Sequence, residues 1–181
     1  MSIIFFSGSR SITRLNADIR QRIINNVIKN QFDIVLGDAN GADKAFQKLF
    51  AEQRYDKVQI FCSGTTFRNN LGNWQVNFVP SNQKGRDFYT EKDKKMATIA
   101  DYGFILWDGE SIGSLNNISE LLNHKNPSLI YHSPNKQFLD IKSFKDLKNI
   151  IDYQNKNLIN DILKKGNLYL KQLVTPQFSL I

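Results

Sequence analysis

Residues 34–43 read IVLGDANGAD, an apolar run of strand length that passes into a glycine-rich turn and then into a helical pattern. The same design occurs at residues 3–10, which read IIFFSGSR, and at residues 104–114, which read FILWDGESIGS. In open α/β sheets, such turns lie where strand carboxyl ends meet helix amide groups, and anions and nucleotides bind there. Three of these turns in one chain of 181 residues therefore predict one shared binding pocket.

Apolar runs and helical patterns alternate along most of the chain. The strand-like runs are short and mostly unalternating, as is typical of strands covered on both faces, and they lie at residues 3–7, 34–37, 58–61, 76–79, 104–107 and 128–131. Helical spacing occurs between them, at residues 15–29, 42–53, 90–100 and 115–123. This alternation favours a mostly parallel sheet with right-handed crossovers. We therefore predict an α/β fold, a Rossmann-like three-layer sandwich with a helical C-terminal extension.

The pattern changes beyond residue 135, so we predict a nucleotide-binding domain over residues 1–135 and a helical extension over residues 136–181. In the extension, apolar residues recur at near-heptad spacing, at Phe144, Leu147, Ile151, Leu158 and Ile162. We expect one long helix or two, packed on the core or on a partner subunit, and from this a homo-oligomer. Residues 65–84 are rich in Asn, Gly and Ser, and we expect a loop that covers the pocket.

The composition favours a cytoplasmic protein with anionic partners. The 24 Lys and Arg residues exceed the 17 Asp and Glu residues, and the net charge of +7 favours nucleotides or other anionic partners. No apolar run is long enough to span a bilayer and no secretory signal is recognised, so we expect no membrane partner. Cys62 is the only cysteine, which excludes an intrachain disulfide and fits a reducing compartment. Neither histidine has metal-ligand spacing, so we expect no metal site and no cofactor.

The first turn and one later arginine indicate a phosphate site. Gly8 lets the backbone approach a ligand closely, between the hydroxyls of Ser7 and Ser9. Arg10 would either pair with a phosphate through two hydrogen bonds or extend into water. Arg86, in a loop before a helix, would either reach the same phosphate or pair with a neighbouring acid.

In the second turn, Gly37 ends the strand, and Asp38 or Asn40 would cap a helix that begins near Gly41. The small residues there leave room for a ligand across the unpaired amides of the first helical turn. Asp43 suits the helix dipole but would repel a phosphate placed beside it. It would therefore orient a loop, hold a ribose hydroxyl, or only stabilise the helix end.

The third turn has the most features of an anion site. Asp108 and Gly109 favour a sharp turn, and small and hydroxyl-bearing residues follow, up to a helix expected from Leu115. Such residues before a helix N-terminus form a cradle for an oxyanion. No Lys follows the glycines, so the loop is not a Walker A loop. Trp107 would either stack on a base or lie in the core.

These turns supply the candidate ligand-binding residues, which are Ser7, Gly8, Ser9, Arg10, Gly37, Asp38, Gly41, Ala42, Asp43, Arg86, Trp107, Asp108, Gly109, Ser111, Gly113, Ser114 and Asn117. Their order and spacing, together with Asp93, Met96-Ala97 and Ala100-Asp101, resemble the SLOG superfamily over roughly residues 2 to 133. That group unites DNA-processing protein A, the LONELY GUY phosphoribohydrolases and many small bacterial and phage Rossmann-like proteins. The resemblance implies a nucleotide or nucleotide-like ligand at the carboxyl edge of the sheet.

The LONELY GUY branch of that superfamily cleaves the N-glycosidic bond of nucleoside monophosphates with a loop glutamate. Here Asn117 stands at the position of that glutamate, and Lys92-Asp93 stands where an Arg-Lys pair precedes it. An amide cannot stabilise an oxocarbenium-like centre or activate water as a carboxylate does. Asp93, Asp101, Asp108 or Glu110 would have to replace the glutamate, with Asp93 and Glu110 as the candidates, so the sequence leaves open whether the chain is an enzyme.

Three functions therefore follow from the sequence. The first is binding of a nucleotide or nucleotide-derived ligand, with a role in sensing. The second is hydrolysis or transfer at the N-glycosidic bond of nucleoside monophosphates. The third is binding of single-stranded DNA, which similarity to DNA-processing protein A implies.

Overall fold

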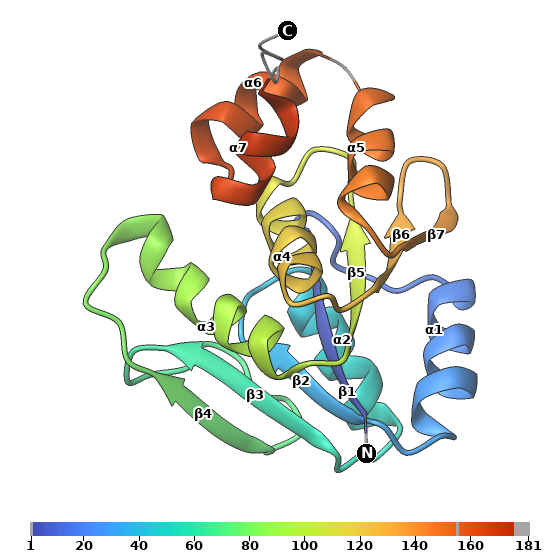
Figure 1. The fold of residues 1–181 in the computed structure, drawn as a ribbon. Coiled ribbons are helices and arrows are strands. Elements are labelled where there is room, and N and C mark those ends of the chain that lie inside the picture. Colours follow the sequence, from blue (N-terminus) through green and yellow to red (C-terminus); the bar gives the residue numbers. More distant parts are fainter. Residues whose placement is uncertain (1, 155, 176–181) are drawn as a thin grey trace, which may run out of the picture.

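The structure is a computed structural model that describes residues 2–154 and 156–175. Within them, a seven-stranded sheet runs in the order β4-β3-β2-β1-β5-β6-β7, with helices on both faces (Figure 1). The strands are β1 (Ile3–Gly8), β2 (Asp33–Gly37), β3 (Val58–Ser63), β4 (Gln75–Val79), β5 (Tyr102–Trp107), β6 (Ser128–His132) and β7 (Gln137–Ile141). The helices are α1 (Ala17–Ile23), the π-helix η1 (Ile24–Ile28), α2 (Ala42–Glu52), α3 (Gly85–Ile99), α4 (Ile112–Asn123), α5 (Phe144–Asp152), α6 (Lys156–Lys165) and α7 (Leu168–Val174).

The predicted Rossmann-like α/β sandwich is confirmed. Strands β1 to β6 pair in parallel, and only β7, at one edge of the described sheet, is antiparallel. In the central strand, Phe5 and Phe6 are both fully buried but belong to different cores. Successive side chains of a strand point to opposite faces, so strands covered on both faces need continuous apolar runs.

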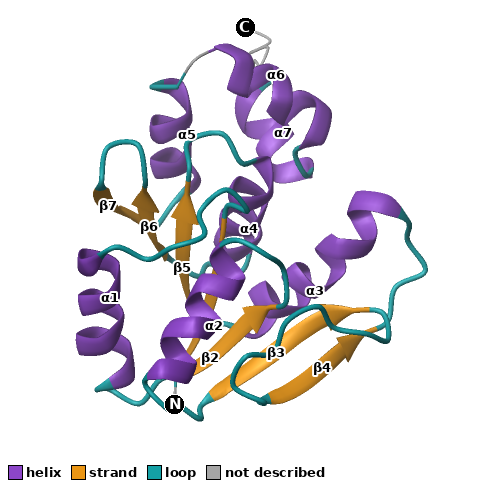
Figure 2. Ribbon diagram, turned by 180° about the vertical axis from the view of Figure 1, so that it is seen from behind, coloured by secondary structure: helices purple, strands orange, loops and turns teal. Residues whose placement is uncertain are grey.

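Two helix layers cover the two faces of the sheet. Helices α1, η1 and α2 pack on the face that carries Phe6, whereas α3, α4 and the C-terminal helices pack on the face that carries Phe5. The two opposite views show α2 on one side of the sheet and α3 and α4 on the other (Figures 1 and 2). Among the described residues, no helix combines the length and apolar character needed to cross a membrane.

The path of the chain makes the region beside β1 a candidate ligand site. From β1 the chain passes outward through β2 and β3 to the edge strand β4, and α3 then carries it back to β5, on the other side of β1. The connections after β1 and β5 thus diverge, and open α/β sheets bind ligands at the carboxyl ends of such a strand pair.

The C-terminal region is helical, as expected, but it begins with a strand. Residues 137–141 form β7 because a turn at residues 133–136, rich in turn-forming residues, returns the chain along β6. A hydrogen bond of 3.3 Å from the amide of Lys136 to the carbonyl of Ser133 closes this turn. The prediction of a purely helical extension is therefore wrong at these residues, because the turn at residues 133–136 is not evident from the helical spacing that follows it.

The near-heptad residues of the extension belong to two of its three short helices. Leu147, Ile151, Leu158 and Ile162 are all buried in the chain's own core, where they pack with residues of α4. The apolar stripe that suggested a homo-oligomer is therefore covered within one chain. The oligomer stays a prediction, now without this support.

Two helices begin earlier than predicted. Helix α4 begins at Ile112 rather than Leu115, because the Ser111 side chain caps it and accepts a hydrogen bond of 3.4 Å from the Ser114 amide. Gly113 and Ser114 therefore lie inside the first helical turn. Helix α3 begins at Gly85, so the predicted loop residue Arg86 also lies in a first turn.

Replacing Phe6 by Ala is expected to lower the free energy of unfolding by about 3–5 kcal/mol, the usual cost of truncating a buried aromatic side chain. The Phe6 ring centroid lies 4.9 Å from that of Phe46, 5.2 Å from that of Phe50 and 5.0 Å from that of Phe104. Phe78→Ala is the control, because Phe78 is 48% exposed on β4, and should cost less than about 1 kcal/mol. Urea unfolding compares the two variants, and equal losses would contradict the assigned core.

Candidate functional site

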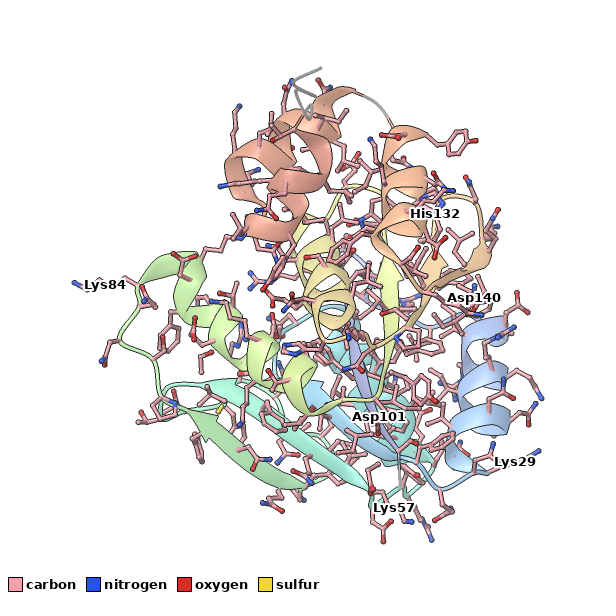
Figure 3. All side chains as sticks on the ribbon, viewed as in Figure 1. Lys29, Lys57, Lys84, Asp101, His132 and Asp140 are labelled. Carbon is pink, nitrogen blue, oxygen red and sulfur yellow. The ribbon has the colours of Figure 1, made fainter. Side chains whose placement is uncertain are left out.

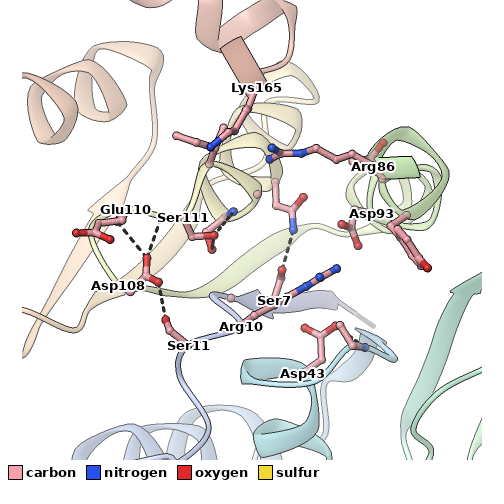
Figure 4. A pocket seen from close by; sticks show the side chains of 18 of the residues that line it. Ser7, Arg10, Ser11, Asp43, Arg86, Asp93, Asp108, Glu110, Ser111 and Lys165 are labelled. Atoms are coloured by element: carbon pink, nitrogen blue, oxygen red, sulfur yellow. Dashed lines mark hydrogen bonds between the residues drawn. The ribbon is translucent and has the colours of Figure 1, made fainter. Parts of the chain in front are cut away.

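A pocket of about 630 Å³ opens at the carboxyl ends of β1 and β5. The turn after β1 forms one side, α4 and α3 form two further walls, and α6 contributes from the C-terminal region (Figure 4). The position is the one that the three glycine-rich turns predicted, although the turns do not contribute equally.

Ser9 joins the turn after β1 to the turn after β5. Its fully buried hydroxyl oxygen lies 3.2 Å from Ser114 Oγ and accepts a hydrogen bond of 3.1 Å from the Asp108 amide. A Cβ at Gly8 would lie 2.6 Å from the Leu106 carbonyl oxygen. Glycine at position 8 therefore lets the two turns approach this closely.

A second contact between these segments lies on the pocket wall. The Asn117 side chain, on α4, donates a hydrogen bond of 2.7 Å to Ser7 Oγ (Figure 4). Both side chains are buried among their neighbours. The amide of Asn117 therefore serves to fix α4 against β1.

Asp108 organises the third turn. Its Oδ1 accepts hydrogen bonds of 3.1 Å from the Glu110 amide and 2.8 Å from the Ser111 amide, and its Oδ2 accepts one of 2.5 Å from Ser11 Oγ. Burial tends to raise the pKa of Asp108, but these hydrogen bonds outweigh it and lower the pKa. Asp108 is thus charged, and both of its carboxylate oxygens accept hydrogen bonds that hold the turn in place.

The first turn of α4 is open toward the pocket. The amides of Ile112 and Gly113 lie in a helical turn that has no intrahelical acceptors for them. A Cβ at Gly113 would meet only Ser111 Oγ, at 3.8 Å. There is consequently room for a ligand atom directly beside these amides, at the positive end of the helix dipole.

The first turn of α2 is closed. The amide of Ala42 already donates to the carbonyl of Ser9 at 3.3 Å. Gly41 has a positive φ of 84°, and a Cβ there would contact the backbone of Arg10. The small residues of the second turn therefore accommodate the chain itself, and the predicted space for a ligand across the α2 amides is filled.

The predicted caps of α2 have other partners. The N-cap residue is Gly41, without a side-chain hydrogen bond. Asp38 binds Arg68 through an ion pair of 2.7 Å, and the Asn40 side-chain oxygen accepts a hydrogen bond of 3.1 Å from Asn69. The prediction was wrong because residues 68–69 of the covering loop, distant in sequence, occupy these side chains.

Five cationic side chains of the described residues line the pocket, and two of them, Arg68 and Lys92, are held by buried carboxylates. The other three come from three different elements and are Arg10 after β1, Arg86 in the first turn of α3, and Lys165 at the end of α6 (Figure 4). Of these, Lys165 forms an exposed ion pair of 3.2 Å with Asp161.

Arg86 forms no ion pair within the described residues. The neighbouring acid Glu91 pairs instead with Lys94, at 2.9 Å. Arg86 is therefore available to an anion in the pocket.

A buried ionic cluster lies between α2 and α3 at the pocket. Lys92 Nζ is 2.8 Å from Asp93 Oδ1 and 3.8 Å from Asp43 Oδ2. Asp43 Oδ2 also accepts a hydrogen bond of 3.2 Å from the Ala39 amide. A Cβ at Gly37 would touch both Asp43 Oδ2 and Lys92 Nζ, so the glycine at the end of β2 makes space for this cluster.

Charge is not balanced in this cluster. Burial raises the pKa of Asp43 to about 6, with Asp93 and Asp38 adding to the rise and Lys92 opposing it. Burial tends to lower the pKa of Lys92, but the surrounding carboxylates outweigh it and raise that pKa. Lys92 therefore stays charged, whereas Asp43 titrates near neutrality.

Most of the predicted site residues line the pocket. These are Ser7, Gly8, Arg10, Asp43, Arg86, Asp93, Asp108, Glu110, Ser111, Gly113, Ser114 and Asn117. The others lie behind its walls and are Ser9, Gly37, Asp38, Gly41, Ala42, Trp107 and Gly109. Asp43 contacts the Ala39 amide, in keeping with the expectation that it orients a loop.

Two residues of the third turn need correction. Trp107 is fully buried, with its ring centroid 5.1 Å from that of His132. It therefore belongs to the core, the alternative that the sequence left open, and cannot stack on a ligand's base. Gly109 has a positive φ of 87° and lies against Pro134, so it shapes the turn without reaching the pocket.

Other pocket residues were not among the sequence candidates, and they include Ser11, Arg68, Tyr89, Lys92 and Lys165. Helical spacing could have identified Lys92, which lies four residues before the buried Met96 and so on the same face of α3. Arg68 lies in the loop that was expected to cover the pocket. Nothing in the sequence indicates Lys165, because only the packing of α6 brings it there.

No protein-family model matches the sequence, and no curated protein matches it. Among solved structures, the chain is similar to DNA processing protein A from Helicobacter pylori, in a study of its single-stranded DNA binding mode. The TM-score is 0.52 and the sequence identity 15%, over 96% of this chain and 78% of that chain. A likeness at this identity shows a shared fold, and it confirms the fold that the SLOG resemblance implied.

Asp43→Asn is expected to change how stability depends on pH. Folding raises the pKa of Asp43 to about 6, so its contribution is complete below its unfolded pKa near ~3.9 and is lost as pH rises through the folded pKa. Relative to the Asn variant, the native chain should lose up to about 1.4 kcal/mol per pH unit between about pH 4 and 6.

Urea unfolding across this pH window measures the effect. Asp18→Asn is the matched control, because Asp18 is exposed and also lies in the first turn of a helix. If Asp43→Asn and the native chain differ by a constant amount at every pH, the assigned pKa shift is wrong.

Proposed function

We propose that the pocket binds a nucleotide or nucleotide-derived ligand, with a phosphate at the first turn of α4. The supporting observation is that this turn combines unpaired amides, open space at Gly113 and nearby cationic side chains. Backbone amides, a helix dipole and arginines are the groups with which proteins bind phosphate. The cavity, at about 630 Å³, falls within the size range of small-molecule sites.

The charges of the pocket support this position for the phosphate. The α2 end holds the Asp43 and Asp93 carboxyls against Lys92, so an anion there would meet carboxylates. The α4 end faces Arg86 and Lys165, with the exposed Glu110 at the third turn. Phosphate at α4 leaves the carboxyls of the α2 side for hydroxyl or amine groups of the rest of the ligand.

The contacts of Asn117 and Asp93 favour binding of the ligand without hydrolysis. Asn117 stands where the LONELY GUY glutamate would be, and its side chain is held by Ser7. Asp93, one candidate replacement, is bound to Lys92 at 2.8 Å. One oxygen of this carboxylate is therefore already occupied by an ion pair. We therefore propose a binding protein with a role in sensing.

A second candidate is binding of single-stranded DNA, because the similar solved structure concerns this activity in DNA processing protein A. The same arginines would then contact backbone phosphates. A long binding track for a DNA strand would need basic residues side by side, and several of them instead lie far apart. Lys29 and Lys57 lie near the amino ends of the strands and Lys84 at the start of α3 (Figure 3).

Isothermal titration with nucleoside mono-, di- and triphosphates tests the first proposal. Gly113→Ala should weaken binding about 10-fold or more by placing a methyl group beside the phosphate, while stabilising the helix by about 0.5–1 kcal/mol. Arg86→Gln should weaken binding about 10-fold, as loss of a charged hydrogen bond does. Arg54→Gln is the matched control, because Arg54 follows the far end of α2. Absence of heat with every nucleotide would overturn the proposal.

Anisotropy of a labelled single-stranded oligonucleotide tests the second candidate. The logarithm of the binding constant should fall with the logarithm of salt concentration by about 0.7 per contacted phosphate, and Arg86→Gln should reduce that slope by about one. An oligonucleotide that does not bind at low salt would eliminate this function.

A further inference from the structure

Tyr89, on α3, presents its ring at the edge of the pocket. Tyr89 is 43% exposed. Among the described residues that line the pocket, it is the only aromatic one. The buried Trp107 cannot serve a base, so any aromatic contact to a ligand in this pocket has to come from Tyr89.

One face of the Tyr89 ring is already supported. The guanidinium carbon of Arg68 lies over it, 5.0 Å from the ring centroid. The Phe88 ring lies edge-on, with centroids 5.2 Å apart and planes at 85°. A Cβ at Gly64 would lie 2.8 Å from the Phe88 ring, so that ring is itself seated against the loop backbone. Among the described residues, Arg68 is the one cation found over the Tyr89 ring, and Tyr89 still keeps 43% of its surface exposed.

The supporting arginine is fixed in place before any ligand arrives. Arg68 donates to the Asp38 carboxylate from Nε at 3.0 Å and from a terminal guanidinium nitrogen at 2.7 Å. Its backbone amide donates to the same carboxylate at 3.1 Å. Asp38 is 2% exposed, so a buried carboxylate holds the Arg68 guanidinium through the two side-chain hydrogen bonds. Little conformational entropy remains to be lost when a second ring stacks on Tyr89.

We propose that the open face of Tyr89 is the base subsite of this pocket, on which the nucleobase of the ligand stacks. The inference rests on the proposed function, because it requires the phosphate at the first turn of α4. The ligand would then span from α4 to the facing helix α3, with its sugar between them near Asp43 and Asp93. Both walls of the pocket would take part in recognition.

Stacking on a tyrosine face predicts a particular class of ligand. Every base has an aromatic face, and larger bases offer more stacking area, so purine nucleotides should bind more tightly than pyrimidine nucleotides. Selection between two purines would need hydrogen bonds that stacking does not supply. The subsite therefore accepts purine nucleoside phosphates as a class.

Titration of AMP, UMP and ribose 5-phosphate into the native chain and three variants tests the subsite. Tyr89→Ala and Tyr89→Leu should weaken AMP binding about 10-fold by removing the stack, and Tyr89→Phe should retain it. Ribose 5-phosphate has no base, so its affinity should not change in any of these variants. Tyr102→Ala is the matched control. Tyr102 is 47% exposed, but it lies at the amino end of β5, whereas the pocket opens at the carboxyl ends of the strands.

The outcomes separate the two proposals. If AMP binds and Gly113→Ala weakens it, but both Tyr89→Ala and Tyr89→Leu bind AMP like the native chain, only the base subsite is overturned. Equal losses of AMP and ribose 5-phosphate in the Tyr89 variants would also overturn it, because the loss would then be structural. If ribose 5-phosphate and every nucleoside mono-, di- and triphosphate fail to bind, the proposed function fails and the subsite with it.

Discussion

The pocket exists because two turns 105 residues apart in the sequence meet at one buried hydroxyl, that of Ser9. This hydroxyl contacts Ser114 and accepts from the Asp108 amide, so it joins the end of β1 to the start of α4. The contact requires the absence of a side chain at Gly8. Because these contacts join the two turns, they fix the position of the first turn of α4, which is open toward the pocket.

The pocket separates two kinds of charge, and burial is what separates them. Lys92 and the Asp43 carboxyl are almost completely buried and face each other, so they stabilise the wall between α2 and α3. Arg10, Arg86 and Lys165 line the cavity at its surface, where the ion pair between Lys165 and Asp161 is exposed to solvent. The proposed ligand would therefore face a carboxyl side and a cationic side, which would set the direction in which an anionic molecule fits.

The sequence predicted those features of the fold that depend on residues close together in the chain. Continuous apolar runs identified six strands because strands covered on both faces need no polar alternation, and the glycine turns identified the edge at which the pocket opens. The same reasoning did not settle Trp107, because a tryptophan at a strand end has the same local pattern whether it is buried or exposed. It also missed the strand after the turn at residues 133–136, where the partner strand, and not propensity, decides the structure.

The sequence alone determined the α/β architecture, the carboxyl edge as the position of the pocket and most of the predicted residues that line it, because these follow from the periodicity and turns of neighbouring residues. The tertiary structure decided which helix end stays open. At α2, the backbone of residues 9–10 fills the space at Gly41, whereas nothing fills the space at Gly113 of α4. It also brought Arg68 beneath Tyr89 and Lys165 to the pocket. Such contacts join residues far apart in the chain, so only folding can bring them together.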